Sequence, residues 1–530
     1  MSFPRVLPVG EAALTVELGG ALDSATNARV LSLERDLALD PFEGFCEAVP
    51  SHRSLLVLFD PAAVRFGALA SHLVARAARG VVSSAPGRLH EVPAVYGGES
   101  GPDLPALARE RGLSEVEVVR LHADGLYTAF MLGFTPGFAY LGLLPEALET
   151  PRHSTPRVRV PAGSVAVAGR QTGIYPVASP GGWQLIGRTS RRLFDPFRAE
   201  PALFAPGDRV RFLPVAELPP PEPASAVPTS PLTPVVEVVE PGLLTTVQDL
   251  GRAGYRRVGV SRAGPMDARA HAAANRAVGN PGGAAALECT MAGPALAFVA
   301  PSRVAVAGAD LGAVLERADL GVWPVPLGAS VLARPGNVLR FTARRSGCRA
   351  YVALQGGIDV PAVLGSRATD LQSGFGGFAG RPLAVGDLIA ALPAAGAGGA
   401  AGEAPLERPA RSATVRVVLG PQSDHFDAGT TARFLASPWR VSVTSDRVGC
   451  RLEGEPLRHA GPAEILSDGM VAGSIQVPPD GRPIVMTADG PTTGGYPKIA
   501  TVLTADLPLL AQLVPGEGEV RFEAVRVEDL

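Results

Sequence analysis

The pattern of hydrophobic and polar residues changes near residue 90 of this 530-residue chain. Before residue 90, strand-like apolar runs at 13–18 and 54–59 alternate with helix-like runs at 23–38 and 61–78. Strands that alternate with amphipathic helices over such a short stretch are typical of a small α+β unit. We therefore predict an α+β domain over residues 1–89.

From residue 90 onward, the apolar residues form short β-branched runs that Gly and Pro separate. Examples are RVRVPAGSVAVAG, WQLIGRTS, RVAVAGADLGAVL, CRAYVALQGGIDV and EVRFEAVRV. Many short strands at close spacing are typical of barrels or sandwiches. The predicted fold class is mainly β with an α+β part, in which repeated β-barrels follow the N-terminal domain.

Two segments far apart in the chain resemble each other. VPAGSVAVAGRQTGIYP (160–176) and VPPDGRPIVMTADGPTTGGYP (477–497) both contain a strand, a glycine turn, a second strand and a loop that ends in Tyr-Pro. This alignment places Tyr175 and Tyr496 at equivalent positions. We expect that one type of barrel is used more than once in the chain.

Two segments interrupt the strand pattern. Residues 214–234 contain eight prolines in 21 residues, a composition that favours polyproline II and cannot build a sheet interior. Residues 392–413 are rich in Gly and Ala and are expected to be flexible. These linkers divide the chain into the predicted units 1–89, 90–213, 235–391 and 414–530.

Composition excludes several classes of protein. Hydrophobic residues make up 46% of the chain and charged residues 19%, so most of it is predicted to fold. The net charge of −3 gives no electrostatic reason to expect a nucleic acid or an anionic membrane as partner. We find no run of 18 apolar residues and no secretory signal, so we expect a cytoplasmic protein without a membrane span.

The basic residues point to one position. Among 48 lysine and arginine residues, Lys498 is the only lysine. Lysine is a compact charge that can lose its proton, whereas arginine is a planar, permanent cation. A composition that avoids lysine elsewhere indicates a role for Lys498 that arginine cannot fill. We expect an exposed lysine whose removal lowers turnover and leaves stability nearly unchanged.

The loop that contains this lysine is the strongest candidate for chemistry. TADGPTTGGYPK (487–498) follows a predicted strand, and its glycines leave backbone N–H groups free to face an anion. We predict Lys498 and Asp489, which bracket the loop, to be catalytic, and Thr493 and Tyr496 to bind substrate. The alternative is a solvated lysine beside a tight turn.

Aromatic residues, which are only 5% of the chain, gather around GFTPGFAYLG (133–142). They form either a core plug between domains or the wall of a pocket, and Phe134 and Phe138 are the candidates for substrate binding.

RQTGIYPVASPGGWQLIGR (170–188) offers Arg170 and Arg188 as a fork for a carboxylate, with Tyr175 between them. For both arginines the alternative is a solvated face. Two further acids, Asp446 and Asp468, are interpreted as loop caps rather than bases.

Several common motifs are missing from the sequence. It contains no G-x-x-x-x-G-K-[ST] phosphate loop, no H-E-x-x-H and no complete G-x-G-x-x-G. The eight histidines are scattered, so no metal site is predicted. The Met-Lys pair that usually carries biotin is also absent, so we expect no biotin on this chain.

These motifs together resemble a known family. GFTPGFAYLG, PRVRVPAGSVAVAGRQTGIYP, SPGGW and LIGRT resemble the B-type subunit of bacterial ATP-dependent 5-oxoprolinase, the KipI or allophanate-hydrolase-subunit-1 family. TVQDLGRAGY, VSRAGPMD, AANRAVGN, LQGGID, LGSRATD, SDRVGCRL and DGPTTGGYPKIA resemble the C-type subunit, the KipA or allophanate-hydrolase-subunit-2 family. Both are similar to the carboxyltransferase region of urea carboxylase. The Pro-rich segment is then the junction of two fused subunits, the B type before the C type.

The resemblance implies cyclophilin-like β-barrels and a reaction in which 5-oxoproline, ATP and water give glutamate, ADP and phosphate. It implies ATP, with Mg²⁺, as co-substrate. It also implies a separate A-type 5-oxoprolinase subunit, of the LamB/YcsF family, as partner, without which the chain is expected to be inactive. Two residues depart from the family pattern: Pro491 stands where a glutamine is expected, and His153 where an arginine is expected.

Two alternative functions remain open at this point. The first is a biotin-dependent carboxyltransferase that acts on a urea-like amide and uses the same barrels. The second is a regulatory protein that binds and inhibits a sensor histidine kinase.

Overall fold

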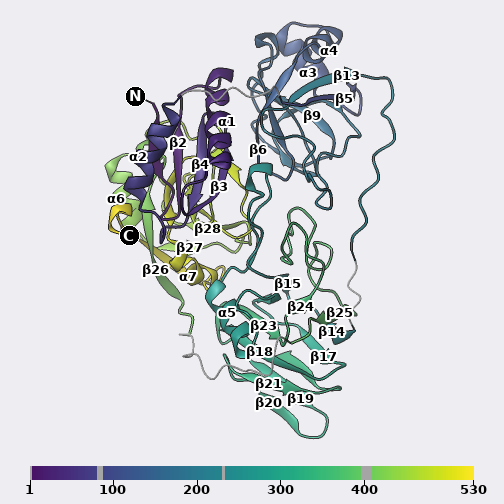
Figure 1. The fold of residues 1–530 in the computed structure, drawn as a ribbon, viewed down its shortest axis with the longest axis vertical. Coiled ribbons are helices and arrows are strands. Elements are labelled where there is room, and N and C mark those ends of the chain that lie inside the picture. Colours follow the sequence, from purple (N-terminus) through teal and green to yellow (C-terminus); the bar gives the residue numbers. More distant parts are fainter. Residues whose placement is uncertain (1–2, 80–86, 229–232, 395–407) are drawn as a thin grey trace.

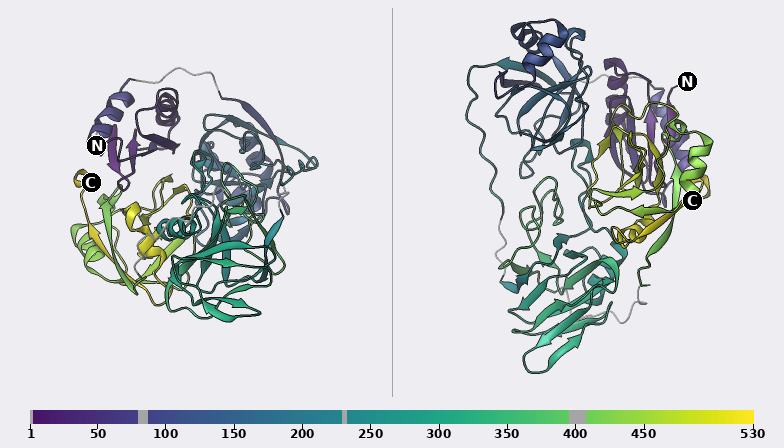
Figure 2. Two further views of the ribbon diagram at one scale, coloured as in Figure 1. Left: turned by 60° about the horizontal axis from the view of Figure 1, so that its bottom comes forward. Right: turned by 180° about the vertical axis from the view of Figure 1, so that it is seen from behind.

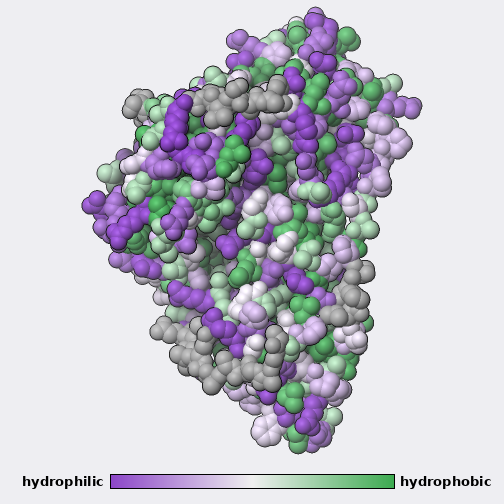
Figure 3. Space-filling model, in the orientation of Figure 1, coloured by the Kyte–Doolittle hydropathy of each residue, from purple (hydrophilic) through white to green (hydrophobic). Residues whose placement is uncertain are grey.

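The computed structural model describes residues 3–79, 87–228, 233–394 and 408–530. It is built mostly of strands, and these form an α+β domain, two closed barrels and a pair of packed sheets (Figure 1). The prediction of a mainly β fold with repeated barrels and a small N-terminal α+β domain is confirmed. On the face shown in Figure 3, hydrophilic and hydrophobic residues are interspersed. Within the described residues, no helix is both long enough and apolar enough to cross a membrane.

The N-terminal domain packs two helices on a four-stranded antiparallel sheet of order β1-β2-β4-β3. Its first helix begins after Asp23, because the Asp23 carboxylate accepts the N–H of Thr26 at 2.7 Å and so caps the helix. The apolar face of that helix covers the sheet. The elements are β1 (Arg5–Pro8), β2 (Ala13–Glu17), α1 (Ser24–Leu39), β3 (Phe45–Pro50), β4 (Ser54–Phe59) and α2 (Phe66–Ala77).

Barrel 1, the first closed barrel, has seven strands in the order β10-β7-β6-β13-β5-β12-β9. Two helices and a two-stranded sheet, β11-β8, flank it. The elements are β5 (Leu89–Tyr96), α3 (Leu104–Arg111), α4 (Glu115–Ala123), β6 (Tyr127–Leu132), β7 (Ala139–Gly142), β8 (Arg157–Val160), β9 (Ser164–Ala168), β10 (Gln171–Ile174), β11 (Ser179–Gly181), β12 (Gln184–Arg188) and β13 (Arg209–Pro214).

The third unit is a sandwich of a seven-stranded and a five-stranded sheet around one apolar core. The larger sheet contains β14 (Pro234–Glu240), β17 (Ala295–Phe298), β19 (Ala313–Arg317), β20 (Gly321–Pro324), β22 (Val338–Phe341), β24 (Ile358–Asp359) and β25 (Leu388–Ala391). The smaller contains β15 (Leu244–Gln248), β16 (Ala286–Thr290), β18 (Ser302–Asp310), β21 (Ser330–Ala333) and β23 (Ser346–Leu354), and α5 (Ala268–Ala277) packs on it.

Barrel 2 is again closed and seven-stranded, in the order β26-β33-β30-β31-β28-β27-β34, with a flanking pair β29-β32. The elements are β26 (Ser412–Leu419), α6 (Ala428–Ala436), β27 (Trp439–Val441), β28 (Gly449–Glu453), β29 (Asp468–Gly469), β30 (Ser474–Gln476), β31 (Ile484–Met486), β32 (Thr493–Gly494), β33 (Lys498–Val502), α7 (Leu507–Ala511) and β34 (Glu519–Ala524).

The two barrels share one topology. In each, the first and last strands pair in parallel, β5 with β13 and β26 with β34, and the other pairs in the barrel are antiparallel. The remaining strands follow in the same order, and the flanking sheets β11-β8 and β29-β32 occupy the same places in the chain order. The expectation that one barrel type is used twice is therefore correct.

The register of that duplication differs from the sequence alignment. Gly163 and Gly473 have φ of +81° and +95° and begin equivalent hairpins. The carbonyl of Tyr175 accepts the N–H of Gly163, and the carbonyl of Met486 accepts that of Gly473. Tyr175 is thus equivalent to Met486, and its predicted equivalence with Tyr496 is wrong. Two successive loops of each barrel contain similar glycine-rich sequences, so the sequence alignment matched β9 with the strand after its true counterpart, β30.

The same register gives the counterpart of the single lysine. In β12, Leu185 lies opposite Ala166 just before a one-residue bulge; in β33, Lys498 lies opposite Gln476 just before a bulge at the same step. Leu185 and Lys498 therefore occupy equivalent positions in the two barrels.

The linkers are only partly described. Residues 215–228 form neither helix nor strand and run along the outside of the molecule (Figure 2). Two of them are held on barrel 1: Glu222 binds Arg198 at 2.7 Å, and the Ser225 hydroxyl donates to Asp195 at 2.9 Å. Of the predicted linker 392–413, residues 395–407 lie outside the described part of the chain, and β26 already begins at Ser412.

The N-terminal domain lies against barrel 2, the barrel distant from it in sequence (Figures 1 and 2). The carboxylate of Glu11 accepts the N–H of Thr504 at 2.7 Å, and a Cβ atom at Gly469 would press on Leu56 of β4. The first half of the chain therefore contributes to the surroundings of barrel 2.

Candidate active site

The two predicted motifs, 133–142 of barrel 1 and 487–498 of barrel 2, meet in space. The hydroxyl of Thr493 accepts the N–H of Phe134 at 3.2 Å. A Cβ atom at Gly133 would collide with that hydroxyl, so the approach requires glycine. The sandwich closes the junction, since the N–H of Gly137 donates to the carbonyl of Val258 at 2.9 Å. Parts of three units thus meet at this junction.

Lys498 lies at this site but is fully buried, with 0% of its side chain exposed. The expectation of an exposed lysine is wrong, because β33 is buried along its whole length. Its Nζ atom lies 3.1 Å from Oδ2 of Asp468. An ammonium group has three N–H donors, and among the described residues only Asp468 accepts from it. The other two donors have no acceptor among the described residues, and the side chain is closed off from solvent.

Asp468 is the partner that makes a buried lysine possible. Its Oδ1 accepts the hydroxyl of Ser54 at 2.5 Å, and its Oδ2 accepts the amide of Gln422 at 3.1 Å. Burial alone raises the pKa of Asp468, but the charge of Lys498 and these hydrogen bonds outweigh it and hold the pKa below its usual value. Asp468 is therefore an ionised member of a buried pair and not a loop cap.

The N-terminal domain and barrel 1 supply further polar groups. His52 is buried beside Ser54, and burial lowers its pKa to about 3, so the ring is neutral. Tyr140 packs edge-to-face on His52 with 5.4 Å between ring centroids, and its hydroxyl interacts with Thr493. The exposed Arg152 acts electrostatically on both His52 and Tyr140. A second cation thus lies at the edge of the site.

Asp489 belongs to a different polar cluster from Lys498. Its two carboxylate oxygens accept from Arg447 at 2.9 and 2.8 Å, and Arg447 also contacts Glu288 of the sandwich. Burial raises the pKa of Asp489 to about 6, against the charge of Arg447. The two residues predicted to be catalytic therefore have different partners: Asp489 faces the sandwich, whereas Lys498 faces the N-terminal domain.

The predicted aromatic residues divide between core and surface. Phe138 and Tyr175 are buried in an apolar cluster of barrel 1, and burial raises the pKa of Tyr175 to about 12. Phe134 is 37% exposed with φ of +67° and borders the junction. Tyr496 is half-buried, and its carbonyl accepts from Gln476 at 3.3 Å. Of these four, Phe134 adjoins Thr493 directly.

Arg170 and Arg188 are both exposed, and Arg188 donates to the carbonyl of Ala162. Neither is among the residues that contact the Lys498 pair, so their substrate-binding roles stay predictions. The sequence reasoning missed four members of the site. The run Ser51-His52-Arg53-Ser54, polar between two apolar strands, was a usable signal for two of them. The four are Ser54, His52, Gln422 and Arg152.

Two protein families match the chain, one on each side of the Pro-rich linker. Residues 4–204 match the family described as carboxyltransferase domain, subdomains C and D, and residues 258–524 match subdomains A and B. The chain is 44% identical over 218 residues to the B-type subunit of 5-oxoprolinase from Escherichia coli O157:H7, covering 41% of this chain and 99% of that one. It is 38% identical over 284 residues to the C-type subunit from Escherichia coli K12, covering 53% and 89%.

Two further comparisons bear on the fold and the family. The crystal structure of TTHA0988 is 38% identical with a TM-score of 0.84, covering 96% of this chain and 99% of that chain. The urea amidolyase of Lachancea kluyveri is 34% identical over 307 residues, which are 53% of this chain and 16% of that protein. The resemblance to fused B-type and C-type subunits, and to the carboxyltransferase region, is confirmed.

Proposed function

Because this chain belongs to the carboxyltransferase-domain family and joins a half like the 5-oxoprolinase B-type subunit to a half like the C-type subunit, we propose that it is the combined B and C component of an ATP-dependent 5-oxoprolinase. A separate A-type subunit completes the enzyme, and 5-oxoproline and ATP are the substrates.

One observation carries this proposal: both halves build the site around Lys498. Ser54 comes from the B-like half and donates to Asp468 of the C-like half, which binds Lys498. Phe134 of the B-like half donates to Thr493 of the C-like half. A site shared in this way explains why two subunits act together and why their fusion preserves the arrangement.

The arrangement suits activation of a cyclic amide. Resonance makes the lactam carbonyl a poor electrophile, so the γ-phosphoryl group of ATP is transferred to its oxygen. Water then adds to the carbon, the ring C–N bond breaks, the nitrogen takes a proton, and a second water releases phosphate. For this step the buried Lys498 must open to the lactam oxygen, whose negative charge its N–H donors then stabilise, while Asp468 keeps the ammonium charged and oriented. Arg152 binds the substrate carboxylate.

The test is reconstitution with the A-type subunit. We expect ATP-dependent release of glutamate from 5-oxoproline when the chain is co-expressed with an A-type protein, and none from either component alone. Glutamate release by the chain alone would contradict the requirement for a partner. A reconstituted complex without activity would contradict the proposed substrate.

A second candidate is a biotin-dependent carboxyltransferase. The description of the matched family and the similarity to urea amidolyase favour it. The same Lys498 donors would then hold the carbonyl oxygen of a urea-like amide. Carboxylation of urea in the presence of a biotin carboxylase and its biotin carrier, without glutamate release in the first assay, would select this candidate.

A further inference from the structure

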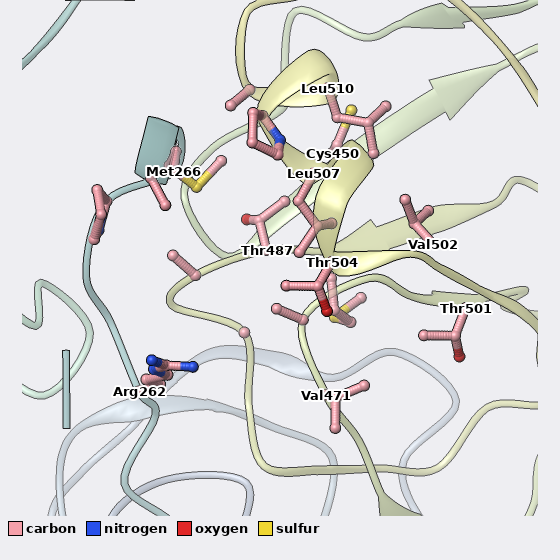
Figure 4. A pocket seen from close by; sticks show the side chains of 18 of the residues that line it. Arg262, Met266, Cys450, Val471, Thr487, Thr501, Val502, Thr504, Leu507 and Leu510 are labelled. Atoms are coloured by element: carbon pink, nitrogen blue, oxygen red, sulfur yellow. The ribbon is translucent and has the colours of Figure 1, made fainter. Parts of the chain in front are cut away.

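A cavity of about 320 Å³ lies beside the same loop but is lined by other residues than the Lys498 pair. The N-terminal domain, the segment before α5 and barrel 2 all contribute to its walls, which include Thr487, Ala488, Gly490 and Pro491. Thr487 and Met266 are among the lining residues in Figure 4. Its volume is at the lower end of the range for small-molecule sites. The larger apolar side chains of the lining include Leu58, Leu250, Met266, Val471, Leu507 and Leu510.

One of the arginines in the lining has no acidic partner among the described residues. Three arginines line the cavity, and two of them have acidic neighbours: Arg256 lies 3.5 Å from Glu47, and Arg349 lies 3.8 Å from Glu288. Arg262 uses its Nε–H on the carbonyl of Leu250, and within the described parts of the chain its Nη atoms contact no carboxylate. It is exposed and lies at one side of the lining, across from Leu510 and Val502 (Figure 4).

The two acidic side chains of the lining each accept a backbone N–H group. Glu11 accepts the N–H of Thr504 at 2.7 Å, and Asp446 accepts the N–H of Val448 at 2.8 Å. Among the described residues, the cavity therefore offers apolar walls, an exposed edge and one guanidinium without an acidic partner. A guanidinium in such a place binds a carboxylate through two parallel hydrogen bonds.

We propose that this cavity binds a small organic carboxylate with an apolar body, such as an aryl or branched alkyl acid, whose carboxylate pairs with Arg262. The proposed ligand class, defined by its apolar body, differs from 5-oxoproline, a small polar cyclic amide. An occupant also contacts Gly490 and Pro491, close in sequence to Thr493, and Val502, the last residue of β33. The cavity therefore borders the loop that carries Thr493 and leads to Lys498.

The test compares an acid with its neutral counterpart on the full chain. Phenylacetate and phenylacetamide have the same apolar body, and isothermal titration measures the binding of each. We expect phenylacetate to bind saturably at one site per chain and phenylacetamide to bind about tenfold more weakly or worse, since a hydrogen bond to a charged group is lost. Arg262→Gln should remove this preference. Arg458→Gln, which changes an exposed arginine outside the lining, should keep it.

A filled cavity provides the second test. Ala472→Phe places a ring in the lining and should abolish binding of both probes, while unchanged thermal unfolding shows that the fold is intact. Leu507→Trp serves the same purpose if the first variant unfolds. Equal affinity of the two probes, a preference that survives Arg262→Gln, binding that survives a filled cavity, or no saturable binding up to the solubility limit would each overturn the proposal.

Discussion

The two barrels of this chain share a strand order but fill one equivalent position in opposite ways. In barrel 1 the position is Leu185, buried in a cluster with Tyr140, Tyr175 and Trp183. In barrel 2 it is Lys498, buried against Asp468. In barrel 1 this position is filled by an apolar side chain among apolar neighbours, whereas in barrel 2 it holds a charged side chain with an acidic partner.

The difference shows where function is added to a duplicated fold. An apolar side chain needs only its neighbours in the same barrel, whereas the buried ammonium needs Asp468, and Asp468 needs Ser54 from another domain. Buried ion pairs are weak evidence for stability, since apolar residues of similar volume often replace them without loss. We infer that barrel 2 keeps the pair for chemistry, and substitutions at these positions test that difference.

Breaking the pair should have the largest effect. Lys498→Ala and Asp468→Ala each leave one buried charge uncompensated, which costs about 3–5 kcal/mol of stability. The double variant Lys498→Leu with Asp468→Leu copies the apolar pattern of barrel 1 and should recover most of that loss. It should still lower turnover of the reconstituted enzyme by about a hundred- to a thousandfold. Thermal unfolding and the glutamate assay measure the two effects.

A double variant that unfolds as readily as the single variants would show that packing, and not charge, determines this position. Full turnover in the double variant would remove Lys498 from the chemistry. Lys498→Arg adds a further distinction, because the wider guanidinium must enter a fully buried space. We expect it to be less active than wild type and less stable, by about 1–3 kcal/mol.

Asp489→Asn should have a smaller effect that depends on pH. The pKa of Asp489 is raised from 3.8 to about 6 in the folded chain, so the folded state binds more protons between these values than the unfolded state. Wild-type stability therefore falls relative to the variant as pH rises from 3.8 to 6, and the difference is constant above 6. Thermal unfolding of both proteins across this range checks the sign. A difference that grows in favour of wild type would refute the raised pKa.

Ser54→Ala removes the contribution of the N-terminal domain to the pair. The hydroxyl donates to an ionised carboxylate, so its loss should cost about 1.5–3 kcal/mol. The pKa of Asp468 is lower in the folded chain than in the unfolded chain, so ionised Asp468 stabilises the fold at high pH, and this stabilisation is lost as pH falls through the folded pKa. Without the Ser54 hydrogen bond the folded pKa is higher, so the variant should lose this stabilisation at a higher pH than wild type does. Ser71→Ala, at an exposed helix position of the same domain, is the control. It should change neither the free energy of unfolding nor the pH at which stability is lost.

Cutting the Pro-rich linker should have the smallest effect. Glu222 and Ser225 are held on barrel 1, so we place the cut at 229–230, beyond them. The two halves should co-purify and retain activity, because Ser54–Asp468 and Phe134–Thr493 contacts join them without the linker. Halves that separate on size-exclusion chromatography would show that the linker holds the junction together.

Local sequence patterns were enough to predict the classes of element, the duplication and the loop that contains the single lysine. These follow from patterns within a few residues: short β-branched runs, glycine turns and a composition that avoids lysine. The same local patterns gave a wrong equivalence between Tyr175 and Tyr496. Neighbouring turns with similar residues can be distinguished only when the pairing of the strands is known.

The burial of Lys498 and the identity of its partner depend on contacts between parts of the chain that are distant in sequence. Every residue of β33 is buried, so the strand has no alternation from which an inner and an outer face can be predicted. Asp468 is 30 residues from Lys498, and Ser54 is 414 residues from Asp468. Charge stabilisation depends on distance in space and on exclusion of water, and both are set by the packing of domains that lie far apart in the chain.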